Sequence, residues 1–168
     1  YTVSEDGLIY TFKIRDKAVF HDMVPITADD IVFTVSKVKD PNMKSALASN
    51  WQGVEINKIN EKTVEIRLRS PYTPFIENTT LGIIPKHIWQ DADIEQFTFS
   101  TYNFEPVGSG PYKIHKIKRT ATGVLEYYEL RAFSKYAPGQ KNISTIFIYF
   151  FKDTAEVIRA LEKGTINS

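Results

Sequence analysis

The sequence predicts an α/β fold in which mixed, largely antiparallel sheets are flanked by helices. Three observations support this prediction. Leu8–Arg15 alternates apolar and polar residues with a period of two, as a half-buried strand does. Thr27–Lys39 repeats apolar residues at helical spacing between two defined ends. After Gly108–Pro111 the pattern changes to a run of strands that is followed by an amphipathic helix.

The best defined element is the helix that begins at Thr27. Thr27 is suited to the N-cap position, and Asp30 three residues later can complete a capping box. One apolar stripe recurs along the helix and predicts its buried face: Ala28, Ile31, Val32, Val35 and Val38. Pro41 follows the last turn and ends the helix, because proline cannot continue it.

The middle of the chain predicts a β-hairpin and two short helices. Val54–Asn60 and Thr63–Arg69 form the expected hairpin, joined by a short polar link. The second strand has its apolar residues on one face: Val64, Ile66 and Leu68. Prolines then interrupt the pattern, and short helices are expected around Phe75–Thr80 and Pro85–Trp89.

The last third of the chain predicts strands at Tyr112–Arg119, Val124–Arg131 and Ile143–Phe151. Ile143–Phe151 is apolar on both faces, which predicts a central strand covered on both sides. A helix from Asp153 follows, with Gly164 at its C-terminal end. The clearest break in the secondary-structure pattern comes just before these strands, where we predict a turn or hinge. It consists of Gly108, Ser109, Gly110 and Pro111.

Composition excludes several classes of protein. The chain has 168 residues, a formal net charge of +1 and interspersed charges, which argue against nucleic-acid and membrane-surface binding. No apolar run approaches the roughly 20 residues that a membrane-spanning helix needs. Because there is no cysteine, disulfides, thiolate metal sites and cysteine nucleophiles are excluded.

The histidines are candidates for catalytic or metal-binding groups. The chain has three, His21, His87 and His115, and none is spaced from another as metal ligands usually are. A hydrolase that uses His21 and the nearby aspartates is one alternative. The favoured interpretation is that Asp29 and Asp30 serve the start of the helix. We therefore predict no catalytic residue, no metal ligand and no cofactor.

Several motifs resemble one known family, in the order in which that family has them. Phe20–Asp30 (FHDMVPITADD) follows Tyr10–Arg15 (YTFKIR), and Ile84–Ile88 (IPKHI), Pro106–Lys113 (PVGSGPYK) and Ala160–Asn167 (ALEKGTIN) come later. Together they resemble the extracellular solute-binding proteins of peptide/nickel ABC importers, family 5, most closely the oligopeptide/dipeptide branch. Met23 stands where this family usually has glycine, so we expect the turn there to be locally remodelled.

The resemblance implies a periplasmic-binding-protein-like fold of type II. Family members are much longer, so the chain is expected to be a fragment of a parent protein. Residues 1–106 would be an accessory subdomain, and residues 107–168 would be part of the first cleft lobe. The segment after the first helix borders the ligand cleft in this family. The predicted ligand-binding residues are therefore Ser45, Leu47 and Trp51, although a core position is the favoured interpretation for Leu47 and Trp51.

The function that the resemblance implies is binding and not catalysis. The parent would capture peptides or similar solutes outside the cytoplasmic membrane, anchored there by a lipid, and deliver them to the permease subunits of an ABC importer. The partners expected are a peptide or other small solute and the permease, with no nucleic acid, and the fragment is expected to be a monomer. Since the second lobe is missing, we expect the chain alone to bind peptide weakly or not at all. A domain used only for interaction remains an alternative.

Overall fold

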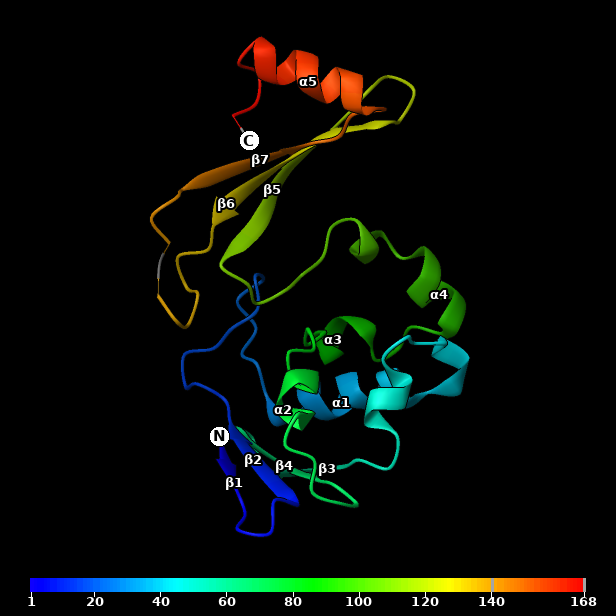
Figure 1. The fold of residues 1–168 in the computed structure, drawn as a ribbon, viewed down its shortest axis with the longest axis vertical. Coiled ribbons are helices and arrows are strands. Elements are labelled where there is room, and N and C mark those ends of the chain that lie inside the picture. Colours follow the sequence, from blue (N-terminus) through cyan, green and yellow to red (C-terminus); the bar gives the residue numbers. More distant parts are fainter. Residues whose placement is uncertain (140, 168) are drawn as a thin grey trace. The chain divides into compact units, whose positions relative to one another are not determined.

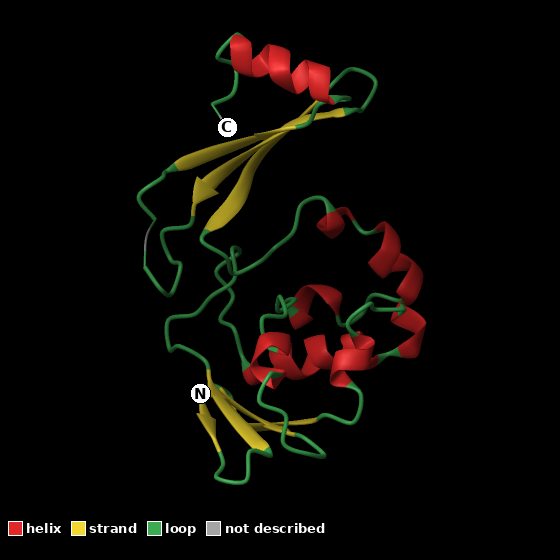
Figure 2. Cartoon of the chain, in the orientation of Figure 1, coloured by secondary structure: helices red, strands yellow, loops and turns green. Residues whose placement is uncertain are grey.

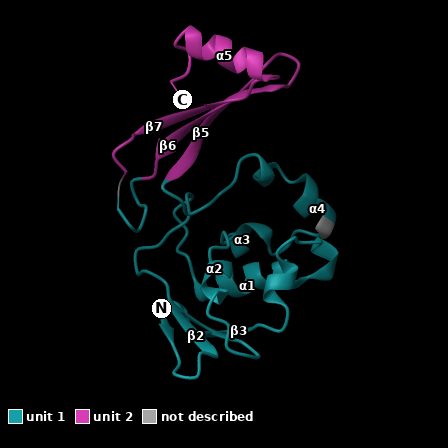
Figure 3. Cartoon of the chain, viewed as in Figure 1, with its two compact units in different colours: residues 1–111, 134–140 teal, residues 112–133, 141–168 magenta. Residues whose placement is uncertain are grey.

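The structure is a computed structural model that describes residues 1–139 and 141–167, and at residue 94 only the backbone. The chain divides into two compact units, which are described separately (Figure 3). Unit 1 contains residues 1–111 and 134–140, and unit 2 contains residues 112–133 and 141–168. The predicted turn Gly108–Pro111 thus ends where unit 2 begins. The assignment of residues 1–106 to an accessory subdomain and of 107–168 to a cleft lobe stays a prediction.

A four-stranded antiparallel sheet forms one layer of unit 1 (Figure 1). Its strand order is β1 (Thr2–Val3), β2 (Ile9–Lys13), β4 (Thr63–Arg67) and β3 (Glu55–Asn60). The predicted strand from Leu8 and the predicted hairpin are therefore confirmed. The sheet places β2 beside β4, with Tyr10 opposite Ile66. This pairing joins segments that lie far apart in the sequence.

Helices are drawn in red in Figure 2. In unit 1 the helices that were predicted from Thr27, around Phe75–Thr80 and around Pro85–Trp89 are confirmed. The helices of this unit are α1 (Ala28–Lys39), α2 (Phe75–Asn78), α3 (Lys86–Trp89) and α4 (Ile94–Phe99). Short 3₁₀ turns lie at Pro41–Met43, Ala48–Trp51 and Thr101–Asn103. The helix α1 lies against β3 and β4 and buries Val35 and Val38 there. Of the predicted buried stripe, Ala28, Val35 and Val38 are buried, whereas Ile31 and Val32 are half-buried.

The main core of unit 1 lies between α1 and the sheet. It is a cluster of buried apolar residues: Tyr10, Val35, Val38, Trp51, Val54, Ile66, Leu68 and Phe75. The Phe75 ring meets Tyr10 and Trp51 edge to face, at centroid distances of 5.3 Å and 5.5 Å. Such aromatic pairs contribute about 0.5–1.5 kcal/mol beyond the area that they bury. Phe75 therefore joins the 3₁₀ turn at Ala48–Trp51 to strand β2.

A second cluster forms around the hairpin-like loop before α1. Ala18, Phe20 and Ile26 are buried there, and Val107 and Ala137 pack against them. The loop is closed by backbone hydrogen bonds from Phe20 N to Val24 O and from Ile26 N to Ala18 O, at 2.9 Å and 3.0 Å. The loop before the helix thus builds a small, separate core.

The turn at Met23 corrects one expectation. Met23 has φ 75°, in the left-handed region that glycine adopts freely, and its side chain is 51 % exposed. Met23 N donates to Phe20 O at 2.9 Å, which closes a four-residue turn. A turn of this kind often ends with a residue in the left-handed conformation. The expected remodelling is therefore wrong, because methionine accepts the conformation that favours glycine.

Unit 2 contains an antiparallel sheet in the order β5 (Tyr112–Arg119), β6 (Leu125–Ala132) and β7 (Thr145–Tyr149), followed by α5 (Thr154–Glu162). The expected central strand is wrong for this chain. Within the described residues β7 pairs only with β6 and lies at an edge of the sheet. Its apolar residues on both faces are partly exposed, among them Phe147 and Ile148.

Candidate functional site

The structure separates the three predicted ligand-binding residues. Trp51 is 2 % exposed and belongs to the core of unit 1, whereas the Leu47 side chain is 43 % exposed. Ser45 is half-buried, and its hydroxyl accepts a hydrogen bond from Leu47 N at 3.2 Å. Ser45 and Leu47 thus lie in the same short turn, while the Trp51 side chain lies in the core and contacts Phe75. A ligand role for these residues stays a prediction.

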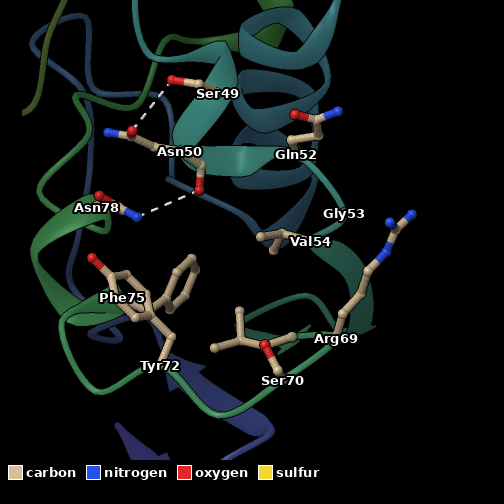
Figure 4. Close-up of a pocket in the computed structure, with 11 residues that line it drawn as sticks. Ser49, Asn50, Gln52, Gly53, Val54, Arg69, Ser70, Tyr72, Phe75 and Asn78 are labelled. Carbon is tan, nitrogen blue, oxygen red and sulfur yellow. Dashed lines mark hydrogen bonds between the residues drawn. The ribbon is translucent and has the colours of Figure 1, made fainter.

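The segment that follows this turn lines a pocket of about 380 Å³ (Figure 4). We call it the Arg69 pocket, and it is lined by residues of the segments 49–54 and 68–78. Its apolar lining includes Val54, Leu68 and Phe75, which are buried core residues. The core of unit 1 therefore fixes the floor of the pocket.

Polar side chains surround this floor. Ser49, Asn50 and Asn78 lie on one side of the pocket in Figure 4, and Arg69 extends past Gly53 on the other. The Asn78 side-chain amide donates to the carbonyl of Asn50 at 3.4 Å, which links α2 to the 3₁₀ turn. None of the residues that line the pocket is acidic. The pocket therefore has an apolar floor and polar sides, and Arg69 places one permanent positive charge at its edge.

Sequence reasoning did not select Arg69 or Asn78. From the sequence, Arg69 was predicted only as the end of a strand and Asn78 only as part of a short helix. They line the pocket with residues 49–54 because the segment after β4 and the helix α2 lie beside the 3₁₀ turn. No periodic signal marks such a meeting of distant segments.

The predicted turn at Gly108–Pro111 is held by His21. Gly108 N donates to Nδ1 of His21 at 3.3 Å, and Nε2 of His21 lies 3.1 Å from Gly110 O. Since a carbonyl oxygen only accepts, Nε2 carries the proton and donates. The His21 backbone N–H also donates to Gly108 O at 2.8 Å. Ser109 and Gly110 line a separate, largely apolar pocket of about 420 Å³ with residues of unit 1.

The alternative of a hydrolase at His21 finds little support in these contacts. Asp22 Oδ2 lies 2.7 Å from Nε2 of His87, and Asp29 Oδ2 lies 2.6 Å from Nζ of Lys58. Asp30 accepts hydrogen bonds at the start of α1. The nearby aspartates thus all have structural partners. The capping role that was favoured for Asp30 is confirmed.

The ion pair between Asp29 and Lys58 determines the clearest electrostatic shifts in unit 1. The hydrogen bond from Lys58 lowers the pKa of Asp29 below its ordinary value of 3.8. Asp29 and then Glu61 raise the pKa of Lys58 above its ordinary value of 10.5. Both groups lie at the surface, so the pair is a local feature and not a buried reactive site.

The described residues bear on metal binding and on membrane insertion. Among residues 1–139 and 141–167, no group of three or more His, Cys, Asp or Glu residues is placed to bind a metal ion. Within the same residues, no helix combines the length and apolarity needed to cross a membrane.

Comparison with known proteins defines the class of protein as a solute-binding protein. The chain matches the family described as "Bacterial extracellular solute-binding proteins, family 5 Middle" over residues 1–168. It belongs to this family. The resemblance seen in the sequence motifs is thus confirmed, and so is the fold, which solved binding proteins share.

Individual relatives agree with this assignment. The oligopeptide-binding protein AppA of Bacillus subtilis is 29 % identical over 167 residues, which cover 97 % of this chain and 30 % of AppA. The solved substrate-binding protein CtaP of an ABC transporter from Listeria monocytogenes is 34 % identical, with a TM-score of 0.83, over 98 % of this chain and 33 % of CtaP. NikZ from Campylobacter jejuni, solved with Ni(L-His), is 29 % identical, with a TM-score of 0.84, over 98 % of this chain and 32 % of NikZ. The chain therefore spans about a third of the length of these relatives.

Proposed function

We propose that the chain is part of the substrate-binding component of an ABC importer, which captures peptides or similar solutes outside the cytoplasmic membrane. The observation that supports this proposal most is the family match over residues 1–168. AppA of Bacillus subtilis is named an oligopeptide-binding protein and has been solved with a nonapeptide. Peptides are therefore the first class of solute to test.

The proposed mechanism is binding followed by closure. The parent protein closes two lobes on its solute and docks on the permease subunits of the importer, held at the outer face of the membrane by a lipid anchor. Closure of this kind needs a ligand that binds the closed state more tightly than the open one. In this proposal Ser45 and Leu47 face the solute, and Gly108–Pro111 contributes to the hinge. No step in it is catalytic.

The proposed function is tested on the full-length parent. The freshly purified parent is denatured, and the small molecules that it releases are identified by mass spectrometry. A set of short peptides of mixed sequence is the expected result. A single metal chelate would move the protein to a different solute class, and an empty extract from a protein that also fails to bind added peptides would contradict solute capture.

The chain alone provides a second test. Because the chain spans about a third of its relatives, we expect it to bind peptides weakly or not at all. Calorimetry with the peptides released from the parent measures this directly. Micromolar binding by the chain alone would show that the second lobe is not needed, which contradicts the proposed closure mechanism.

A further inference from the structure

We propose that the Arg69 pocket binds the free carboxylate of a small ligand that also carries an apolar group. The proposal concerns unit 1 alone, and it holds or fails independently of solute transport by the parent. It rests on the charge of Arg69, the space that Gly53 leaves for it, the apolar floor and the amide group of Asn78.

The charge of Arg69 is uncompensated in the described part of the chain. No hydrogen bond or ion pair joins its guanidinium to another residue of 1–139 or 141–167, and no acidic residue lines the pocket. Two cations of the adjacent sheet differ in this respect. Arg67 lies 3.7 Å from Glu65, and Lys58 lies 2.6 Å from Asp29. The donors of Arg69 are therefore available for an external anion, and a guanidinium fits a carboxylate with two parallel hydrogen bonds.

Gly53 leaves the space in which Arg69 lies. Gly53 has φ 76°, and a Cβ built on it would lie 2.7 Å from Nε of Arg69 and 2.9 Å from its Cδ. A Cβ at position 53 would therefore force the Arg69 side chain to shift from its present position. Glycine also adopts the positive φ of this position without strain.

The floor of the pocket suits an apolar group of modest size. Phe75, Val54 and Leu68 form it, and the ring of Tyr72 adds to the wall. A volume of about 380 Å³ lies at the lower end of the range for small-molecule sites, roughly 300–1,000 Å³. A ligand about as large as a single capped amino acid fits this range. A long peptide does not fit within the pocket itself.

The side of the pocket opposite Arg69 provides groups that recognise an amide. Asn78 uses one amide donor on Asn50 O at the long distance of 3.4 Å, so its side chain keeps further capacity to donate and accept. The Ser49 hydroxyl makes an equally long contact of 3.5 Å with Asn50 Oδ1. Both long contacts can be exchanged for shorter ones to a ligand. An acylated amino acid would therefore place its carboxylate at Arg69 and its amide toward Asn78.

The test uses two probes that differ only in the carboxylate. N-acetyl-leucine and N-acetyl-leucinamide are titrated into the ¹⁵N-labelled chain, and the signals of the Gly53 amide and the Asn78 side-chain amide are followed. We expect both signals to shift in a saturable way with N-acetyl-leucine. With N-acetyl-leucinamide we expect an affinity at least about tenfold lower, since a charge-assisted hydrogen-bond pair is lost.

Matched variants locate the site. Arg69→Gln is expected to lower the affinity for N-acetyl-leucine at least about tenfold, whereas Arg67→Gln, which removes a paired arginine two residues earlier, leaves it unchanged. Gly53→Ala provides a second test, because it displaces the guanidinium without removing it. Equal binding of the acid and the amide, or full binding by Arg69→Gln, would overturn the proposal. Absence of saturable shifts with either probe would overturn it as well.

Discussion

Oδ1 of Asp30 accepts a hydrogen bond from the backbone N–H of Lys86 at 2.8 Å, so the first turn of α1 is joined directly to the start of α3. The other oxygen, Oδ2, accepts from the backbone N–H and the hydroxyl of Thr27, at 2.8 Å and 2.9 Å. The Asp30 side chain belongs to a residue that is only 4 % exposed. One buried carboxylate thus caps a helix and holds a second helix in place.

The first prediction is that Asp30→Ala lowers the free energy of unfolding by about 2–4 kcal/mol. The partly buried N–H groups of Thr27 and Lys86 lose their acceptor, and each unpaired group costs about 1–3 kcal/mol. Urea denaturation of the chain, followed by circular dichroism, measures the change. Asp29→Ala is the matched control, because Asp29 lies in the same turn but forms a solvent-exposed ion pair, which contributes little to stability. Equal losses of unfolding free energy in the two variants would show that Asp30 stabilises the chain only through its charge and not through these hydrogen bonds.

The second prediction is that Met23→Gly stabilises the chain by about 0.5–1 kcal/mol. A non-glycine residue pays roughly 1–2 kcal/mol for the left-handed conformation that Met23 adopts, and the greater entropy of unfolded glycine offsets part of this gain. Met23→Ala is the control, because alanine removes the exposed side chain but keeps the Cβ that causes the cost. A thermal midpoint that rises for glycine and not for alanine is the expected result. Equal effects of the two substitutions would mean that the backbone conformation is not the cause.

Local features of unit 1 could be predicted well from the sequence. The cap formed by Thr27 and Asp30 depends on residues three apart, and the buried faces of α1 and β4 follow from periodicity alone. The family motifs predicted the fold of the chain as a whole. The hydrogen bond from Lys86 to Asp30 could not be predicted, because it joins residues 56 positions apart and leaves no periodic signal.

The errors and omissions have related physical causes. β7 has the composition of a covered strand, but composition records what a strand can bury and not which neighbours this chain supplies. Met23 was expected to change its turn, yet the hydrogen bonds around the loop hold the left-handed conformation despite its cost. Arg69, Asn78 and Ser49 line the same pocket only through tertiary packing. A core position was the favoured interpretation for Trp51 and Leu47, and the structure buries Trp51 but leaves Leu47 exposed.

The third prediction concerns the contact between His21 and Gly108. His21→Phe keeps an aromatic ring but removes both side-chain hydrogen bonds, so we expect the Gly108 amide to exchange with solvent about tenfold faster or more. Hydrogen exchange followed by NMR reports on this amide directly. His21→Asn, whose short amide side chain can still accept near the Nδ1 position, is expected to restore part of the protection. Unchanged exchange in His21→Phe would show that the backbone bond from His21 N to Gly108 O is sufficient.

The last prediction is a pH dependence that arises from Asp29 and Lys58. The pKa of Asp29 is lowered in the folded chain, so the stability that it contributes is present above its ordinary value of 3.8 and is lost as the pH falls through the folded pKa. The pKa of Lys58 is raised, so its contribution is present below 10.5 and is lost as the pH rises through the folded pKa. Between these limits the ion pair contributes a constant amount.

Asp29→Asn tests this dependence at the acid limit. We expect the variant to lose less stability than the unsubstituted chain when the pH is lowered from about 5 to about 2, because the unfolded state no longer takes up a proton at this position. Urea midpoints measured across this range give the slope. Asp16→Asn is the control, since Asp16 is exposed and forms no ion pair within residues 1–139 and 141–167. High salt should reduce the difference in stability between Asp29→Asn and the unsubstituted chain, because the ion pair lies at the surface, where salt ions screen it. A slope that matches in the two aspartate variants would mean that Lys58 does not perturb Asp29.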